Sequence, residues 1–322
     1  MNTNTMRMIT IACRVISVAV LVGLAVWVIT SGLFFGRIGN FGFNASGPLN
    51  VASAQSVSAA DINAVQINWV AGNVDVRPWD GSEIQITEFS AHELGEGEAL
   101  RLSTQGGTLR IDFWEDRGIL GSRGRMGNVA ARDLEVLVPH GLSSGLESVA
   151  INGMSSGITV NNIDAARFSA ESMSGRISLS NITSERLEAG TMSGRLELSG
   201  ISADEINLSS VSGRVGLSQA QAHRLDVDTI SGRHEISGAF ERANLESVSG
   251  RVELTSTVLP TDLRVSTVSG RVELTVPNEG GISVQHSSAS GRFSSEIPVV
   301  FDSDVRFNIS TVSGRISIYA LR

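Results

Sequence analysis

The sequence contains no lysine, so all 25 of its basic residues are arginines. Catalysis through a lysine Schiff base and phosphate binding by a P-loop lysine are therefore excluded. The arginines are outnumbered by 33 acidic residues, which gives a net charge of -8. Because nucleic-acid binding needs a basic surface to neutralise phosphates, this balance argues against a general nucleic-acid-binding protein.

Cysteine is almost absent as well. Cys13 is the only one, so the rest of the chain cannot form disulfides or a thiolate metal site. Cys13 precedes the long apolar run of the sequence instead of following it, which also argues against a lipoprotein. We expect no cofactor and no metal ion.

Aromatic residues are scarce, at 5%, although hydrophobic residues make up 41% of the chain. A chain of 322 residues can bury a sizeable core. That core must be built mainly from Val, Ile, Leu and small residues. This composition favours repetitive β structure over a helical enzyme.

One apolar run is long enough to matter for location. Val15 to Phe35 contains no charged residue, and its length is close to the ~20 residues that cross a bilayer as a helix. Arg7 and Arg14 precede the run and Arg37 follows it, which predicts a cytoplasmic N-terminus and an extracytoplasmic remainder, periplasmic or at the cell surface. The alternative is a signal peptide cleaved near Ala54, which would also export the remainder.

Composition divides the chain into four parts. Residues 1–37 form the cytoplasmic stub and transmembrane anchor, or the signal peptide. Residues 38–60 are rich in Gly, Ser, Ala and Asn and indicate a flexible linker. Residues 61–150 predict irregularly spaced strands that cap a repeat, and Gly72 to Val76 echoes that repeat. Residues 151–322 contain the repeat itself.

A repeated Ser-Gly-Arg tripeptide decides the predicted fold. Apolar and polar residues alternate on both sides of each copy, which indicates two short strands joined at a corner. One such unit cannot bury its inner face alone, but stacked units can. The pattern therefore predicts an all-β, single-chain parallel β-solenoid (β-helix) of about 19-residue coils, preceded by an N-terminal transmembrane helix. The glycines of the tripeptide are Gly175, Gly194, Gly213, Gly232, Gly250, Gly270, Gly291 and Gly314.

Columns of the repeat predict which side chains face inward. Apolar residues stand seven, five and two positions before the glycine and two and four positions after it, as in Val268, Val272 and Leu274. The residue three before the glycine is always Ser or Thr, and we expect these hydroxyls to bond the backbone or one another at the corners. We expect the corner glycine to adopt positive φ or to allow close approach of the next coil.

An arginine follows every repeat glycine and gives the first candidate interaction site. These side chains should form an outward stripe, balanced by glutamates two residues further on, such as Glu253. The expected partner is a protein or an anionic polysaccharide of the envelope. The arginine stripe comprises Arg176, Arg195, Arg214, Arg233, Arg251, Arg271, Arg292 and Arg315.

A second candidate is the arginine-rich and glycine-rich segment from Glu115 to Asp133. It could be a mobile basic loop that contacts an anionic polymer or a lipid headgroup, or an insertion without such a role. Its basic residues are Arg117, Arg123, Arg125 and Arg132.

Catalytic pairs are few. Asp226 and Asp228 stand two residues apart, as do Asp302 and Asp304, and paired carboxylates cleave glycosidic bonds. Neither pair has a second pair on the adjacent coil, which indicates solvated charges. We therefore predict no catalytic residues.

Two histidines occupy columns that are mostly apolar. His234 and His286 fall in different columns three coils apart, so they cannot share a metal ion. Each is better explained as a half-buried histidine of the solenoid wall.

Several stretches carry a family resemblance. TVSGRVEL and its copies, together with AGNVDVRPWDGSEIQI and LEVLVPHGL, resemble the bacterial putative-adhesin family of β-strand repeat proteins, a domain of unknown function. The resemblance covers roughly Asp61 to Arg322. It implies an exported or membrane-attached protein without a defined activity, and it brings no catalytic residues.

These observations predict a non-enzymatic, membrane-tethered extracytoplasmic β-solenoid, acting as an adhesin-like or envelope interaction or structural protein. The alternatives are a solenoid that binds or cleaves polysaccharide and a self-assembling envelope scaffold. The sequence stops soon after Arg315 with the strand RISIYALR. This predicts an open coil edge through which copies self-associate.

Overall fold

The computed structural model describes residues 49–94, 99–113, 131–301 and 303–321. Within these ranges the chain is all β apart from one turn of helix, α2 (His140–Ser143). The described residues form two compact units. The N-terminal unit holds 49–207 with 218–220, and the C-terminal unit holds 208–217 with 221–321. The prediction of an all-β protein is confirmed.

The N-terminal unit begins with antiparallel strands. β1 (Asn50–Ser58) pairs with β3 (Glu83–Ser90), which pairs in turn with β6 (Arg132–Pro139). β4 (Arg101–Gln105) and β5 (Thr108–Asp112) form a hairpin. The linker prediction is therefore wrong between Asn50 and Ser58. This uncharged stretch supplies the hydrogen-bonding partner that the edge of β3 would otherwise lack.

Parallel strands complete the N-terminal unit. β2 (Ala64–Trp79) pairs with β7 (Leu146–Asn161), and β7 pairs with β8 (Ala165–Ser172) and β9 (Arg176–Thr191). Val74 faces Ile158 in this register, and Ile158 faces Ile177 of the first Ser-Gly-Arg coil, so the predicted echo of the repeat in β2 is confirmed.

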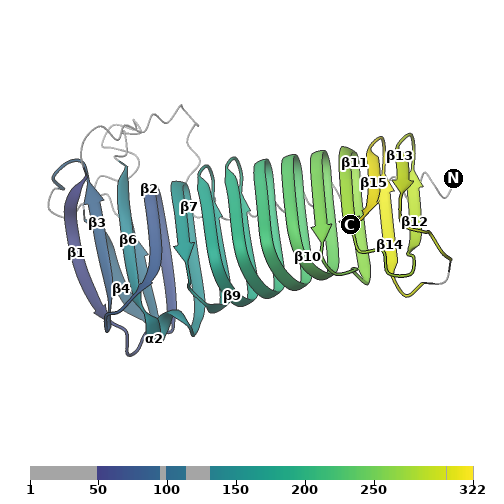
Figure 1. Ribbon diagram of the computed structural model, residues 1–322. Helices are drawn as coiled ribbons and strands as arrows, with labels where there is room; N and C mark the ends of the chain where they lie inside the picture. Colours follow the sequence, from purple (N-terminus) through teal and green to yellow (C-terminus); the bar gives the residue numbers. More distant parts are fainter. Residues whose placement is uncertain (1–48, 95–98, 114–130, 302, 322) are drawn as a thin grey trace. The chain divides into compact units, whose positions relative to one another are not determined.

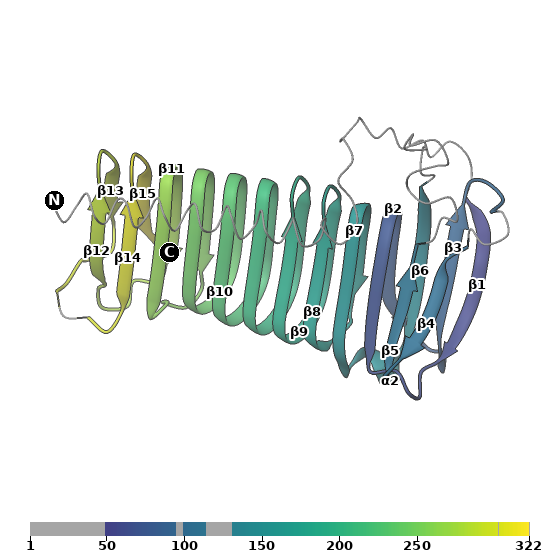
Figure 2. The same cartoon turned by 180° about the vertical axis from the view of Figure 1, so that it is seen from behind.

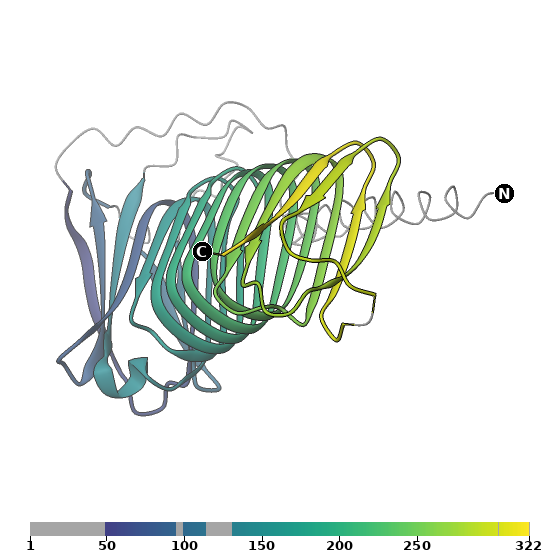
Figure 3. The ribbon, with the colours of Figure 1, turned by 45° about the vertical axis from the view of Figure 1, so that its right-hand side comes forward.

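Only parallel pairs join the named strands of the C-terminal unit (Figure 1). β10 (Arg195–Ser256), which also contributes to the N-terminal unit, pairs with β11 (Asp262–Val276) in one register from end to end, with Gly250 beside Gly270. The remaining strands are β12 (Ser283–Ser288), β13 (Arg292–Ser295), β14 (Arg306–Thr311) and β15 (Arg315–Ala320). Each coil has two strand arms joined by bends (Figure 3), which makes the arrangement β-solenoid-like.

The coils of the C-terminal unit do not stack in chain order. β14 lies between β11 and β12, and β15 lies between β11 and β13 (Figures 1 and 2). The expected open edge at RISIYALR is therefore wrong, because this strand is paired on both sides. The outermost coil of the unit is the one that contains β12 and β13, and it precedes β14 in the sequence.

Core packing follows the predicted columns except at the corner. Val272 and Leu274 are buried at 1% and 0% exposure, as expected. Val268 is half-exposed, whereas Thr267 beside it is buried at 1%. The column of Ser and Thr residues therefore faces the core, and the apolar column next to it lies at the surface. Every second side chain faces inward up to the residue three before the glycine. The next inward side chain is the one two after the glycine, so the alternation is interrupted over five residues at the corner.

Close approach between coils explains the repeat glycine. A Cβ on Gly194 would lie 2.0 Å from the carbonyl oxygen of Gly175, and one on Gly232 would lie 2.0 Å from that of Gly213. Gly232 and Gly250 also have positive φ, at 140° and 139°. Any larger residue would push neighbouring coils apart at these corners.

Most of the predicted hydroxyl bonds at the corners are not formed. The side chain of Ser172 donates to the carbonyl of Ser156 at 3.2 Å, and that of Thr311 accepts from the amide of Gly314 at 2.8 Å. The other buried hydroxyls of this column have no partner among the described residues. They belong to Thr191, Ser210, Thr229, Ser247 and Thr267.

Candidate functional site

The arginine stripe is displayed on the outside of the strands. Four of its members in the C-terminal unit face one another in register across adjacent strands, in the order Arg251, Arg271, Arg315 and Arg292. The side chain of Arg251 is 36% exposed and that of Arg233 is 52% exposed. In the N-terminal unit, Arg176 is 61% exposed. These positions agree with an outward stripe, and its role in binding remains a prediction.

Glutamates balance much of this stripe, as the sequence predicts. The ion pairs Arg195–Glu197 and Arg251–Glu253 measure 3.4 and 3.3 Å. Two further pairs of the same kind, Arg233–Glu235 and Arg271–Glu273, measure 3.7 and 4.0 Å. Exposed pairs like these stabilise a fold little, so their regular display is better explained by solubility or recognition than by stability.

Arg132 does not belong to a solvent-facing basic site. Its guanidinium is 2% exposed, pairs with Glu88 at 2.8 Å and lies 3.9 Å from the ring centroid of Phe113. Glu88, at 0% exposure, also accepts the amide of Leu100. Placing Arg132 in the basic loop is therefore wrong, because a buried carboxylate requires this cation. The other three arginines of that prediction, at 117, 123 and 125, lie outside the described residues.

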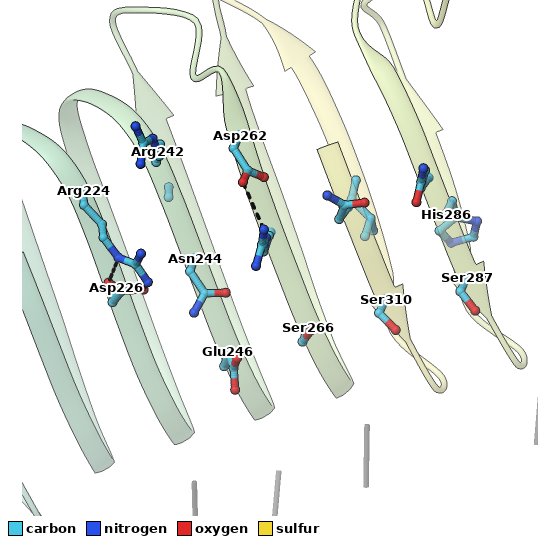
Figure 4. A pocket seen from close by; sticks show the side chains of 15 residues that line it. Arg224, Asp226, Arg242, Asn244, Glu246, Asp262, Ser266, His286, Ser287 and Ser310 are labelled. Atoms are coloured by element: carbon cyan, nitrogen blue, oxygen red, sulfur yellow. Dashed lines mark hydrogen bonds and ion pairs between the residues drawn. The ribbon is translucent and has the colours of Figure 1, made fainter. Parts of the chain in front are cut away.

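The outer face of the C-terminal unit contains a hollow of about 670 Å³ that the sequence did not reveal. Strands β10, β11, β12 and β14 form its floor, and we call it the polar groove (Figure 4). Among the described residues that line it, Ala243 and Ile309 are the only apolar ones, and both are almost fully buried. The polar lining residues are Arg224, Asp226, Arg242, Asn244, Glu246, Asp262, Arg264, Ser266, Gln285, His286, Ser287, Asn308 and Ser310.

Strand register sorts these side chains into rows that cross the strands. One row runs through Asn244, Arg264, Asn308 and Gln285. The next runs through Glu246, Ser266, Ser310 and Ser287. Amides, carboxylates and hydroxyls therefore recur at the spacing of the strands, ~4.8 Å.

Charges in the groove are largely compensated. Arg224 binds Asp226 at 2.5 Å, and Arg264 binds Asp262 at 3.2 Å. Beside the groove, burial raises the pKa of Asp228 to about 6, with Glu246 and Asp226 adding to the effect. Asp226 and Asp228 thus differ: an arginine binds the first, whereas burial and two nearby carboxylates raise the pKa of the second.

The second predicted carboxylate pair is only partly visible. Asp304 is exposed, whereas Asp302 lies outside the described residues. No group of three or more His, Cys, Asp or Glu residues suited to a metal ion occurs within the described ranges.

Neither histidine is half-buried. His234 is 0% exposed, both ring nitrogens lack a hydrogen-bonding partner, and burial lowers its pKa to about 4. His286 is exposed, lines the polar groove, and stacks on Phe293 with ring centroids 5.0 Å apart. The two residues therefore lie apart, one in the core and one at the surface, although both columns were predicted to face inward.

The membrane prediction rests on Val15 to Phe35, which lies outside the described residues. In the part of the chain that the structure describes, no helix is long and apolar enough to cross a bilayer.

The groove could have been found in the sequence only by aligning the polar columns. Asn244 and Asn308 both stand six residues before a repeat glycine, as does Asn207. That signal shows that these residues share a position in the repeat. It does not show which of them are adjacent in space, because the last coils stack in an order that differs from their order in the sequence.

The sequence profile of one protein family, described as Toastrack DUF4097, matches residues 62–318. No curated protein matches the chain. Two solved structures from Parabacteroides distasonis share its fold with TM-scores of 0.54. One, described as a "putative adhesin", is 12% identical over 87% of this chain and 99% of its own. The other, described as a "Putative lipid binding protein", is 14% identical over 84% of this chain and 96% of its own.

Proposed function

The chain belongs to the Toastrack DUF4097 family, and from this premise we propose that it is a non-enzymatic, adhesin-like protein of the bacterial envelope. It presents a β-solenoid of about 19-residue coils to a partner outside the cytoplasm, and the segment Val15–Phe35 tethers it to the membrane. One observation carries the proposal. Chemically alike outward side chains face one another across successive parallel strands, as Arg251 faces Arg271.

Such a surface suits multivalent recognition. Each strand adds one weak contact at a fixed spacing, and the rigid backbone orders these contacts before the partner arrives, which lowers the entropic cost of binding. The description of one structural neighbour as a "putative adhesin" supports this direction. Arginine is also well suited to carboxylates and phosphates, since its planar fork bonds them in a bidentate manner.

The experiment measures binding of the purified chain to isolated envelope polymer. Arg214, Arg233 and Arg251 are replaced together by glutamine, which keeps polar contacts and removes the charge. We expect binding to weaken at least tenfold and to become less sensitive to salt, because fewer charges contribute.

A matched control replaces three arginines outside the stripe, Arg110, Arg167 and Arg186, whose side chains are 51%, 62% and 56% exposed. The net charge changes equally in both variants. If both variants lose binding equally, overall charge explains the effect and the position of the stripe does not. If the stripe variant binds as well as the unaltered chain, the arginine stripe is removed from the proposal.

One observation favours a second candidate function, cleavage of polysaccharide. A carboxyl group with a pKa of about 6, as in Asp228, stays partly protonated at mildly acidic pH beside Asp226, and a raised pKa of this kind is typical of the general acid in glycosidases. The candidate requires release of reducing ends from a glycan panel, and loss of this activity in both Asp228→Asn and Asp226→Asn. Absence of any product would rule out cleavage and leave binding as the proposed function.

A further inference from the structure

The polar groove has the chemistry of a carbohydrate-binding surface, and we propose that it binds an extended, uncharged oligosaccharide laid across the strands. The inference rests on the proposed function, since it names the class of partner for one surface of the same protein. It concerns the groove of the C-terminal unit and does not involve the arginine stripe.

The first argument is the kind of hydrogen-bonding group. Sugar hydroxyls both donate and accept, so they are well met by amides and serine hydroxyls, which offer both roles, and by carboxylates, which accept. Asn244, Asn308 and Gln285 lie in one row. Ser266 and Ser287 offer hydroxyls in the next row, on either side of Ser310, whose own hydroxyl is buried (Figure 4). A linear oligosaccharide with several free hydroxyls on each ring can use both rows at once.

The second argument is charge. Three guanidinium groups and three carboxylates line the groove, those of Arg224, Arg242, Arg264, Asp226, Asp262 and Glu246. Two of the arginines already bind aspartates, at 2.5 and 3.2 Å. A polyanion would find no excess of positive charge here, whereas an uncharged polyol loses nothing by this balance.

The third argument is what the groove lacks among its described lining residues. Its only apolar side chains, Ala243 and Ile309, are 3% and 2% exposed, so it offers no exposed apolar side chain to an acyl chain. β11 and β14 are hydrogen-bonded on both sides, which leaves the centre of the groove without the open edge that a peptide strand needs. The remaining fit is to side-chain hydrogen bonding at intervals of ~4.8 Å, about the length of one pyranose unit in a linear chain.

The test uses the full chain in a detergent without a sugar headgroup. Linear hexasaccharides of glucose, mannose and N-acetylglucosamine serve as probes, and a galacturonic acid hexamer serves as the acidic comparison. Calorimetry should detect binding of at least one uncharged hexasaccharide. The double variant Asn244→Ala, Asn308→Ala should weaken it at least tenfold.

Asn207→Ala is the matched control. It stands at the same position of the repeat, is half-buried like Asn244, and does not line the groove. Its binding should equal that of the unaltered chain, and thermal unfolding should show that all three proteins are folded.

Three outcomes would overturn the inference: no uncharged hexasaccharide binds, the double variant binds as well as the control, or only the acidic hexamer binds. The envelope-polymer experiment separates this failure from that of the proposed function. Binding that depends on the arginine stripe, without any binding of uncharged hexasaccharides, would remove the groove and leave the adhesin-like function in place.

Discussion

Gly314 lies against Gly270 in the stack of coils: a Cβ on Gly314 would be 2.7 Å from the carbonyl oxygen of Gly270. Gly291, which comes between them in the sequence, lies on the other side of Gly314, where a Cβ would be 2.5 Å from the carbonyl oxygen of Gly314. The last coil in the chain is therefore inserted between two earlier ones.

Cysteine pairs can test this order. Ser266 and Ser310 face each other on adjacent strands, and neighbouring strands bring Cα atoms within the range that a disulfide spans. In a chain with Cys13 replaced by serine, the pair Ser266→Cys and Ser310→Cys should oxidise to an intramolecular disulfide, detected by mass spectrometry. The pair Ser266→Cys and Ser287→Cys should not, because β14 lies between them. The reverse result would mean that the coils stack in chain order.

His234, which is buried, and Asp228, which is half-buried, should make stability depend on pH in opposite directions. The pKa of His234 falls from 6.5 to about 4, so the folded state takes up this proton less readily than the unfolded state. Stability from the neutral histidine is present above pH 6.5 and is lost as the pH falls towards 4, by roughly 3 kcal/mol. Urea unfolding of His234→Val should show a gain over the original chain that grows as the pH falls. A constant difference between pH 4 and 7 would contradict this.

Asp228 gives the opposite slope. Its pKa rises from 3.8 to about 6, so its contribution is present below pH 3.8 and is lost as the pH rises through 6, by an amount on the order of 3 kcal/mol. The gain in stability from Asp228→Asn should therefore grow with rising pH. If the two variants gave slopes of the same sign, the burial assigned to one of these groups would be wrong.

Threonine-to-valine substitutions at two equivalent positions should have opposite effects. The hydroxyl of Thr267 is buried without a partner, whereas that of Thr311 accepts the amide of Gly314 at 2.8 Å. Thr267→Val should stabilise the fold by up to about 1 kcal/mol, and Thr311→Val should destabilise it by about 1 kcal/mol. Denaturant unfolding of the two variants measures both values. Equal effects would indicate that the two corners do not differ in hydrogen bonding.

The buried ion pair should be worth far more than an exposed one when a single partner is removed. Arg132→Met leaves the carboxylate of Glu88 buried without its cation, and we expect a loss of about 3 to 5 kcal/mol. Arg167→Met breaks an exposed pair with Glu147, of 62% and 58% side-chain exposure, and should cost well below 1 kcal/mol. Replacing Glu88 and Arg132 together by methionine should recover most of the first loss. Similar losses in the two single variants would contradict the burial of Arg132.

The sequence predicts the strands and most of the core because burial imposes a period of two. Val252, Val272 and Leu274 could be placed from that alternation alone. The period fails at the corner, where chain geometry and not hydrophobicity decides that Thr267 faces inward and Val268 outward. An apolar residue beside a small polar one gives no local signal for this choice.

Register explains what else could not be predicted. The intervals from Gly250 to Gly270 and from Gly270 to Gly291 are nearly equal, so periodicity alone favours stacking in chain order. The groove depends on that stacking, since Asn308 reaches the row of Asn244 only because β14 follows β11 in space. Arg132 could not be recognised as buried, because its partner Glu88 belongs to a separate strand of an irregular region.

The inserted coil also has a consequence for the order of events during synthesis. β12 and β13 leave the ribosome before β14 and β15, yet among the described strands each pairs with one of these later strands alone. Residues 283–295 must therefore wait without a neighbour until residues 306–320 have emerged and entered the stack. Completion of the C-terminal unit thus depends on residues 306–320 and is expected to be slower than the strand-by-strand growth that the coils of β10 permit.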